Sequence, residues 1–537
     1  YTSAGNLATV KNSRGHIKQT NWNSNFPEVF PLRTTNEAGH STVYSYDDLG
    51  RSQTVTAPGG IVTETGYDGL HRMRTSETYS SSAPALISRT EFDYPSANES
   101  RKSTFLDGTT GKVTETSFVD GLGRNYLTRT SGGVENISVS RSFGHNGKES
   151  RITYPYSGTA YDLSRPGSSF EYDALGREIL RILPADSAGT ITRHQRYGLS
   201  RAHVLPGSPV YSWIDSWVEN GAKTTHRHAL SDSLGRLRQV LECSNSLCES
   251  PLTASTDSNR AIYGYDVLNK MTEVCHARNN YDCSADPALR TRMIYDGFGR
   301  LIATKDPDLT NCLDNNPDDL ASGCPILYSY DAAGNILTQT DADYALDPGS
   351  GFKLEMDYDA LNRVIEKRAI KGSNTATSYF IFDLNCLGEQ IPGRLGRDAV
   401  INATDGSDYS NRCYRYDSLG ALAKVETTVK LPGRNAVTRE LGYESYTNGT
   451  LRQASFPGSG STRTLTYSYD HFNRLESIML DGGTSVVQNT SYDARGIENA
   501  INYGNGVDVT FGYYPGSGRL SSITAEAATP ILQLGYS

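Results

Sequence analysis

The sequence predicts an all-β protein in which tandem β-hairpins join edge to edge in one curved sheet. Three observations predict this class. A short motif returns along nearly the whole chain, one turn position is filled by residues that tolerate positive φ, and the composition is rich in Tyr but poor in aliphatic bulk. Each observation has a physical reason, given below element by element.

The motif is clearest between Phe170 and Leu183. Phe170 and Tyr172 alternate with a polar residue, as in a half-buried strand. Asp173 opens a turn, because its short carboxylate can accept hydrogen bonds from backbone N–H groups two or three residues further on. Gly176 supplies a residue with φ > 0, which completes a type I turn followed by a left-handed residue. Ile179–Leu183 then returns as the second strand.

The same motif occurs in twelve clear copies, and the fourth turn position holds eight Gly, three Asn and one His. Gly has no Cβ penalty at φ > 0, and Asn and His are among the few other residues enriched there. Degenerate copies fill the gaps and give a period of roughly 27 residues, which indicates a repeat architecture. Representative turn pairs are Asp47 with Gly50, Asp173 with Gly176, Asp296 with Gly299, and Asp359 with Asn362.

These residues resemble the YD repeat of the Rhs family, whose pattern is an aromatic residue, Tyr-Asp, two variable residues, Gly-Arg and a hydrophobic strand start. Phe170–Ile179 and Met293–Ile302 fit it closely. Rhs proteins, the B and C components of Tc toxins and the teneurins share this repeat. The resemblance implies that the hairpins spiral into a hollow shell, which in bacterial members usually encloses a C-terminal toxin segment.

The composition is compatible with such a wall. The chain has 537 residues with 34 Tyr but only 14 Phe and 5 Met, and a sheet wetted on both faces suits Tyr, which has an apolar ring and a polar hydroxyl. We expect one repeat array over residues 1–537, with less regular insertions near 8–40 and 201–228. We also expect the array to be a piece of a longer chain, because it opens inside one repeat and closes inside another.

Charge and hydropathy exclude two classes of partner. The net charge is −9 with both signs mixed and no basic run, so no nucleic acid is expected. No run of eighteen apolar residues could span a membrane as a helix. In the insertion at 201–228, Trp213 and Trp217 are spaced for one face of a short helix. They either cover the wall or plug an opening in it, or form a stacking platform for a sugar or an aromatic ligand.

All eight cysteines lie between Cys243 and Cys413. They fall into four pairs of neighbours along the sequence, which suggests that each pair forms a local disulfide. An even count in an extracellular-looking chain favours disulfides over zinc, since no Cys-x-x-Cys occurs. Each loop closed in this way would contribute roughly 2–4 kcal/mol. The expected pairs are Cys243 with Cys248, Cys275 with Cys283, Cys312 with Cys324, and Cys386 with Cys413.

No residue pattern indicates catalysis or a cofactor. The repeated Asp residues are interpreted as turn formers, because a catalytic group would not be duplicated twelve times. The Arg or Lys after each turn is expected to pair with carboxylates of adjacent hairpins. An acidic loop is a weak Ca²⁺ candidate through Asp306, Asp308, Asp314 and Asp318, although it lacks the Gly and Glu of an EF-hand.

The sequence therefore predicts a structural protein rather than an enzyme. The leading hypothesis is the β-shell of a secreted or surface-displayed polymorphic toxin that encloses and shields a cargo or toxin polypeptide of its own chain. The alternative is a cell-surface adhesion protein whose repeats bind a glycan. Both place the protein outside the cell or on its surface.

Overall fold

The computed structural model of the chain describes residues 1–23, 29–107, 110–133, 135–184, 190–200, 211–220, 223–243, 258–278, 290–305, 325–402, 409–514 and 516–536. Within these ranges, 41 strands form one sheet, and the only helix is the short α1 (Ala342–Leu346). The all-β class predicted from the hairpin motif is confirmed.

The strands of the first half of the array are β1 (Thr9–Lys11), β2 (Ile17–Trp22), β3 (Pro31–Thr35), β4 (Ser41–Tyr46), β5 (Ser52–Thr56), β6 (Ile61–Tyr67), β7 (Met73–Ser80), β8 (Ala83–Ser96), β9 (Glu99–Asp107), β10 (Thr110–Val119), β11 (Asn125–Gly132), β12 (Glu135–Phe143), β13 (Glu149–Thr153), β14 (Tyr156–Ser157), β15 (Gly167–Tyr172), β16 (Glu178–Ile182), β17 (Ile191–Ser200), β18 (Tyr211–Asn220), β19 (Lys223–Ser231), β20 (Leu237–Cys243), β21 (Ser258–Tyr265), β22 (Met271–Arg278), β23 (Arg290–Tyr295) and β24 (Leu301–Lys305).

The remaining strands are β25 (Ile326–Tyr330), β26 (Ile336–Thr340), β27 (Phe352–Tyr358), β28 (Val364–Lys371), β29 (Asn374–Leu384), β30 (Gln390–Asn402), β31 (Tyr409–Tyr416), β32 (Leu422–Lys430), β33 (Val437–Ser445), β34 (Leu451–Pro457), β35 (Thr462–Tyr469), β36 (Leu475–Leu480), β37 (Thr484–Tyr492), β38 (Glu498–Tyr503), β39 (Asp508–Tyr513), β40 (Leu520–Glu526) and β41 (Pro530–Gly535).

Each strand pairs antiparallel with its neighbour in the chain, except that the short β14 lies beside β12 while β13 pairs with β15. A register shift occurs at the motif Tyr of most hairpins. In the β15–β16 hairpin, Glu171 pairs with Leu180 but Tyr172 pairs with Glu178, so Ile179 is an extra residue in the second strand. Such bulges follow from a type I turn with a left-handed residue, and they bend and twist the strand pair. The repeated bulge therefore gives a physical reason for the curvature of the sheet.

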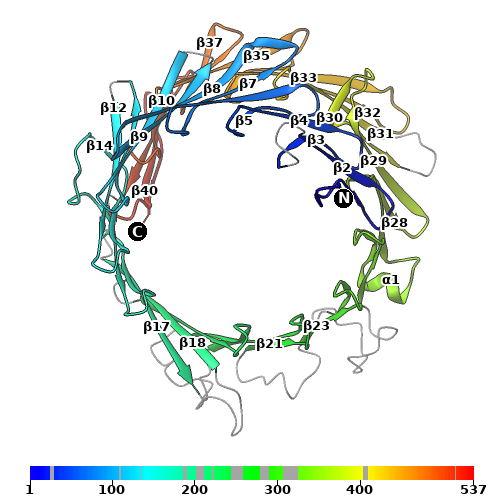
Figure 1. Cartoon of the computed structure of the whole chain (residues 1–537), viewed down its shortest axis with the longest axis horizontal. Helices are drawn as coiled ribbons and strands as arrows, with labels where there is room; N and C mark the ends of the chain where they lie inside the picture. Colours follow the sequence, from blue (N-terminus) through cyan, green and yellow to red (C-terminus); the bar gives the residue numbers. More distant parts are fainter. Residues whose placement is uncertain are drawn as a thin grey trace.

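The sheet winds around an open centre and passes its own starting point (Figure 1). In the view down the shortest axis, β17–β23 form a single wall on one side. On the other side, β33–β37 overlap β5–β10. Both ends of the chain lie on the inner side of the wall in this view. We call β1–β24 the first winding and β25–β41 the second winding.

The wall has little dry core. Buried apolar side chains are few and scattered, among them Leu127, Leu230, Ala303 and Val425. Most other strand residues are half-buried, as expected when one sheet meets solvent or partner atoms on both faces. The thin wall and the open centre agree with the hollow, single-sheet architecture that the repeat resemblance implies.

Two local expectations need comment. The helix considered for Trp213 and Trp217 is wrong: both residues belong to strand β18, where residues four apart also share one face. In the less regular segment 8–40, the described residues form β1, β2 and β3 of the same sheet, and Trp22 Nε1 donates to the Leu7 carbonyl at 3.2 Å.

Candidate functional site: the repeated turns, the seam and the wall

The turn at Asp173 shows the geometry of the repeat. The Asp173 and Gly176 backbones are joined by a 2.9 Å hydrogen bond, and Gly176 has φ of +75°. Asp173 Oδ1 accepts the backbone N–H groups of Leu175 and Arg177, both at 2.9 Å. The carboxylate therefore caps N–H groups two and four residues further on, rather than two and three.

The other turns repeat this geometry. All twelve residues at the fourth turn position have positive φ, including Gly50 at +78°, Gly299 at +76° and Asn362 at +62°. Asp47, Asp296 and Asp359 each accept from the backbone two and four residues on, at distances between 2.8 and 3.0 Å. One side chain thus fixes the turn and its left-handed residue in every copy.

The arginine after the turn pairs differently from the expected ladder of carboxylates between adjacent hairpins. Arg177 Nε and Nη2 donate to Asp173 Oδ2 of its own turn, at 2.7 and 2.6 Å. The same own-turn pair forms at Arg51, Arg72, Arg124, Arg236, Arg300, Arg363 and Arg474. Among these, only Arg363 also pairs with a carboxylate of the next hairpin, Asp383, at 2.6 Å. The own-turn partner prevails because it is already four residues away, so no further chain ordering is needed.

These hydrogen bonds lower the pKa of the turn carboxylates. Hydrogen bonds from the backbone and side chain of Arg177 hold the pKa of Asp173 below its ordinary value. The side chain of Arg51 does the same for the pKa of Asp47, as its largest cause. Such carboxylates stay ionised at neutral pH, which suits a structural clamp and provides no proton for catalysis.

Neighbouring hairpins are joined through the aromatic ring. The guanidinium of Arg177 lies over the Tyr197 ring of the next hairpin, 4.3 Å from its centroid. The Tyr197 hydroxyl donates back to the Glu178 carbonyl at 2.9 Å, directly after Arg177. Burial raises the pKa of Tyr197, so its hydroxyl stays protonated and able to donate.

We call this pairing the Arg–Tyr ladder, and it recurs throughout the sheet. Guanidinium–ring pairs from one hairpin to the next include Arg51 over Tyr67, Arg72 over Tyr94, Arg236 over Tyr265, Arg300 over Tyr330 and Arg474 over Tyr492. Each of these five Tyr hydroxyls donates to the carbonyl of the residue after that Arg. Sequence reasoning missed the ladder, although the Tyr-Asp and Arg periodicity was its signal.

The second winding lies against the first along a line that we call the seam. Arg14 of the first winding donates to the Tyr358 carbonyl at 3.2 Å and to Asn362 Oδ1 at 2.6 Å, and its Nε lies 3.7 Å from Asp331. His40 Nε2 lies 3.6 Å from Asp383. Arg14 therefore contacts motif turns that lie more than 310 residues further along the chain.

Backbone atoms also approach closely at the seam. A Cβ on Gly132 would lie 2.4 Å from the His471 carbonyl oxygen, so only glycine fits there. Gly59 lies beside Pro392, and the Asn448 N–H points to the Leu106 carbonyl at 3.4 Å. At each contact, the edge of the second winding that carries the motif turns meets the opposite edge of the first. We call these the motif edge and the opposite edge.

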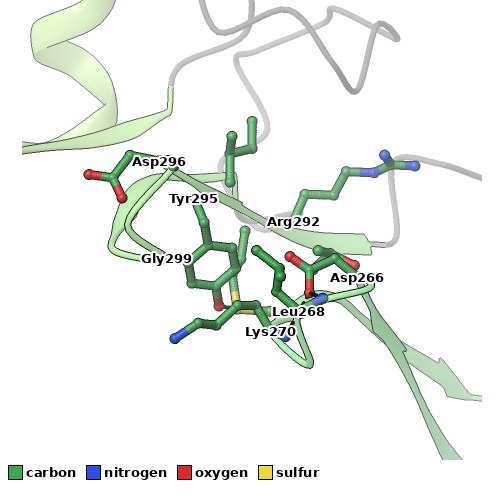
Figure 2. A pocket seen from close by; sticks show the side chains of 11 residues that line it. Asp266, Leu268, Lys270, Arg292, Tyr295, Asp296 and Gly299 are labelled. Carbon is green, nitrogen blue, oxygen red and sulfur yellow. Dashed lines mark hydrogen bonds between the residues drawn. The ribbon is translucent and has the colours of Figure 1, made fainter.

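A groove of 380 Å³ separates the turns of Asp266 and Asp296 on the motif edge (Figure 2). Tyr295 reaches toward the neighbouring turn and donates to the Met271 carbonyl at 2.7 Å. Lys270 lies over Gly299, where a Cβ would be 2.7 Å from its Cε. The lining side chains are therefore those that hold adjacent turns together, and the groove follows from the hairpin spacing.

The two tryptophans lie in a cross-strand aromatic cluster. The Trp217 ring stacks on His194 of β17 at 4.7 Å and on His226 of β19 at 6.0 Å. Trp213 lies over Gly198, where a Cβ would be 2.3 Å from the indole. Both faces of the Trp217 ring are covered, whereas a sugar platform needs an open face. The geometry favours the wall-covering role.

The remaining site predictions fall largely on undescribed residues. A disulfide joins Cys386 to Cys413, and Cys275 is also disulfide-bonded. Cys248, Cys283, Cys312 and Cys324 lie outside the described residues, as does the side chain of Cys243. The Ca²⁺ candidates Asp306, Asp308, Asp314 and Asp318 lie outside them too. Among the described side chains, no group of three or more His, Cys, Asp or Glu could hold a metal ion.

Comparison with known proteins shows similarity in structure alone. No family model matches the chain, and no curated protein matches its sequence. The crystal structure of TcdB2-TccC3 is similar over 97% of this chain, with a TM-score of 0.71 and 14% identity. A TcdB2-TccC3 structure without the hypervariable C-terminal region gives 0.69 and 12%, and the Photorhabdus luminescens Tc holotoxin pore gives 0.71 and 13%.

At this identity the likeness shows the fold alone. It supports the resemblance to YD-repeat shells at the level of structure. The chain spans 28% to 30% of the length of these solved chains. Within the described residues, no helix is long and apolar enough to cross a membrane.

Proposed function

We propose that the chain is part of the β-shell of a secreted or surface-displayed polymorphic toxin, and that the shell encloses and shields a toxin or cargo polypeptide. The observation that carries the proposal is the architecture: a wall one sheet thick that winds around an open centre and overlaps itself at a seam (Figure 1). Such a wall presents paired strands to the outside, so proteases and other proteins meet few free backbone groups.

The mechanism is sequestration rather than chemistry. Most turn carboxylates are paired with an arginine of their own turn, and the motif tyrosines donate to neighbouring carbonyls, so the repeated groups serve the wall. The similar structures include a Tc holotoxin pore, which supports a toxin setting. The disulfide between Cys386 and Cys413 favours an oxidising compartment.

The glycan-binding alternative receives no support from the aromatic cluster. Its central ring, Trp217, is covered on both faces by His194 and His226. We therefore do not carry a second function forward.

Protease protection tests the proposal. The C-terminal end lies on the inner side of the wall (Figure 1), so a flexible, protease-sensitive reporter fused after Ser537 should enter the interior. The matched control carries the same reporter in the exposed turn at Gly433. We expect slower cleavage of the C-terminal reporter than of the control by the same protease. Equal cleavage rates for a folded shell would contradict enclosure.

A further inference from the structure

Each step of the Arg–Tyr ladder holds one guanidinium between two turns. Arg300 pairs with Asp296 of its own turn and lies over the Tyr330 ring of the next hairpin. Its Nη1 also donates at 3.0 Å to the carbonyl of Asp331, the residue that opens the next turn. The same bond to the next turn is made by Arg236 and Arg474. We call these three contacted groups, the carboxylate, the ring and the carbonyl, the guanidinium site of a step.

Two steps have the turn Asp and the Tyr of the next hairpin but no arginine of their own turn. Among the turns that the structure describes, these are the Asp266 turn, where Lys270 takes the place of the arginine, and the Asp331 turn, where Asn335 does. At both steps the three groups of the guanidinium site remain, while the side chain that would occupy it has been replaced.

At the Asn335 step, Arg14 from the first winding supplies the guanidinium. Its Nη2 donates to the carbonyl of Asp359, which opens the next turn, and its Nε lies 3.7 Å from Asp331 Oδ2. These are the next-turn carbonyl and the turn carboxylate that a ladder arginine contacts. Arg14 lies more than 310 residues away in the chain. A step without its own arginine therefore accepts one from outside the hairpin.

At the Lys270 step, no described arginine fills the guanidinium site, and the groove of 380 Å³ lies there (Figure 2). Its lining includes all three residues of the site: Asp266, Tyr295 and Asp296. Asp266 Oδ1 caps the turn by accepting from the backbone of Leu268 and Lys270. Among the described side chains, no cation pairs with Asp266 Oδ2 and none lies over the Tyr295 ring.

Lys270 does not occupy the site itself. In Figure 2 its amino group points away from Asp266. Its Cε lies over Gly299 of the next turn, where a Cβ would be 2.7 Å from it. An ammonium is a compact point charge, whereas a guanidinium is a planar fork that can bind a carboxylate and stack on a ring together. The spacing of the turns thus leaves room that an arginine fills at the other steps.

We propose that the groove at Lys270 binds the arginine side chain of a partner polypeptide, as the Asn335 step binds Arg14. The guanidinium pairs with Asp266 Oδ2, stacks on the Tyr295 ring and donates to the Asp296 carbonyl. Arginine is preferred over lysine because only the planar fork makes all three contacts. The partner binds at the turns, so the proposal does not depend on enclosure of a cargo.

Titration of a blocked Gly-Arg-Gly peptide into the purified chain, followed by saturation-transfer NMR and calorimetry, tests the site. The matched Gly-Lys-Gly peptide should bind about tenfold more weakly or less. Lys270→Arg should abolish binding, because the chain then fills the site while Asp266 and Tyr295 stay in place. Lys148→Arg is the matched control: Lys148 lies over Gly176 in the same way, but Gly144 opens its turn and provides no carboxylate. Binding to this control should be unchanged.

Asp266→Asn tests the carboxylate while keeping the turn cap, since Asn385 Oδ1 caps another turn by accepting from Leu387 and Glu389. Binding should weaken about tenfold or more. Circular dichroism and the thermal midpoint verify that each variant is folded. The proposal is overturned if the natural chain does not bind the arginine peptide, if the lysine peptide binds equally, or if Lys270→Arg binds undiminished. Binding of methylguanidinium without the peptide would likewise overturn it, in favour of a site for a small alkylguanidine.

Discussion

Turns on the motif edge of the second winding, which lie at the seam, and turns on the motif edge of the first winding, which we call rim turns, have the same local geometry but different surroundings. The Asp359–Asn362 turn and the Asp173–Gly176 turn share the carboxylate cap and the left-handed fourth residue. The first is bound by Arg14 from the other winding, whereas the second meets solvent. The hairpin is therefore specified by about six local residues. The contribution of each turn to the stability of the whole shell depends instead on whether another winding packs against it.

The largest expected effect is alkaline unfolding of both regions together, because the Arg–Tyr ladder runs through each. Burial raises the pKa of the ladder tyrosines Tyr197, in the first winding, and Tyr330 and Tyr492, in the second. Outside the ladder, burial and a bond to Asp398 raise the pKa of Tyr414 to about 12. The folded state then holds protons that the unfolded chain has lost above pH 10. Stability is complete below pH 10 and decreases as pH rises toward 12.

Tyrosinate absorbance and circular dichroism recorded along the same titration check this prediction. The two signals should change together above pH 10. Ionisation of most tyrosines near pH 10 with the sheet intact would contradict a ladder of donating hydroxyls.

The next effect separates the regions. Arg14→Ala removes the seam bonds to Tyr358, Asn362 and Asp331, and we expect a local loss of about 2–3 kcal/mol. Hydrogen exchange of β1 and β2 should accelerate by roughly 30- to 150-fold. Arg177→Ala, at an exposed rim turn, is the comparison: it removes the own-turn pair with Asp173 and the ring contact with Tyr197, and it should cost only about 1 kcal/mol, since exposed pairs and exposed ring contacts contribute little. Equal acceleration in both variants would remove the distinction between seam and rim.

Glycine substitutions probe the same distinction sterically. Gly132→Ala places a Cβ against the His471 carbonyl and should cost about 1–3 kcal/mol, as overpacking does. A Cβ on Gly121, in a rim turn, meets nothing within 4 Å, so Gly121→Ala should change stability by less than about 1 kcal/mol. Denaturant unfolding measures both. A tolerated alanine at Gly132 would mean that the windings are further apart than described.

The smallest effect should be equal in the two regions. Tyr358→Phe and Tyr172→Phe each remove one hydroxyl bond within a winding, to the Ile336 and Glu149 carbonyls, and each should cost about 1 kcal/mol. The control is Tyr379→Phe, because no described hydrogen bond involves its hydroxyl. A cost confined to Tyr358→Phe would show that these hydroxyl bonds depend on the contacts at the seam.

The turns could be predicted from the sequence because their causes are local. Asp173 and Gly176 lie three residues apart, and only backbone geometry explains the Gly, Asn and His in that column. The Arg177 partner was misassigned because opposite charges are available both in its own turn and in neighbouring hairpins. The sequence pattern alone does not show which of these carboxylates the arginine prefers. The short stretch of chain between Asp173 and Arg177 decides it, because it holds the two side chains close together.

The seam could not be predicted because its partners are far apart in the chain. Leu106 and Asn448 are 342 residues apart, and the turn Leu is the same letter at Leu175 and Leu361. Only the number of hairpins in one winding decides which turn meets which edge. That number follows from the accumulated twist and bulges, which no local pattern reports.

Small-angle scattering tests the central claim of a hollow, single-sheet shell most directly. A compact globule of 537 residues has a radius of gyration of roughly 24 Å. A wall about 10 Å thick around an open centre places the same mass further from the middle. We predict a radius clearly above the compact value for the monomer at low concentration, with a distance distribution depleted at the centre. A radius near 24 Å with a solid distribution would contradict the shell.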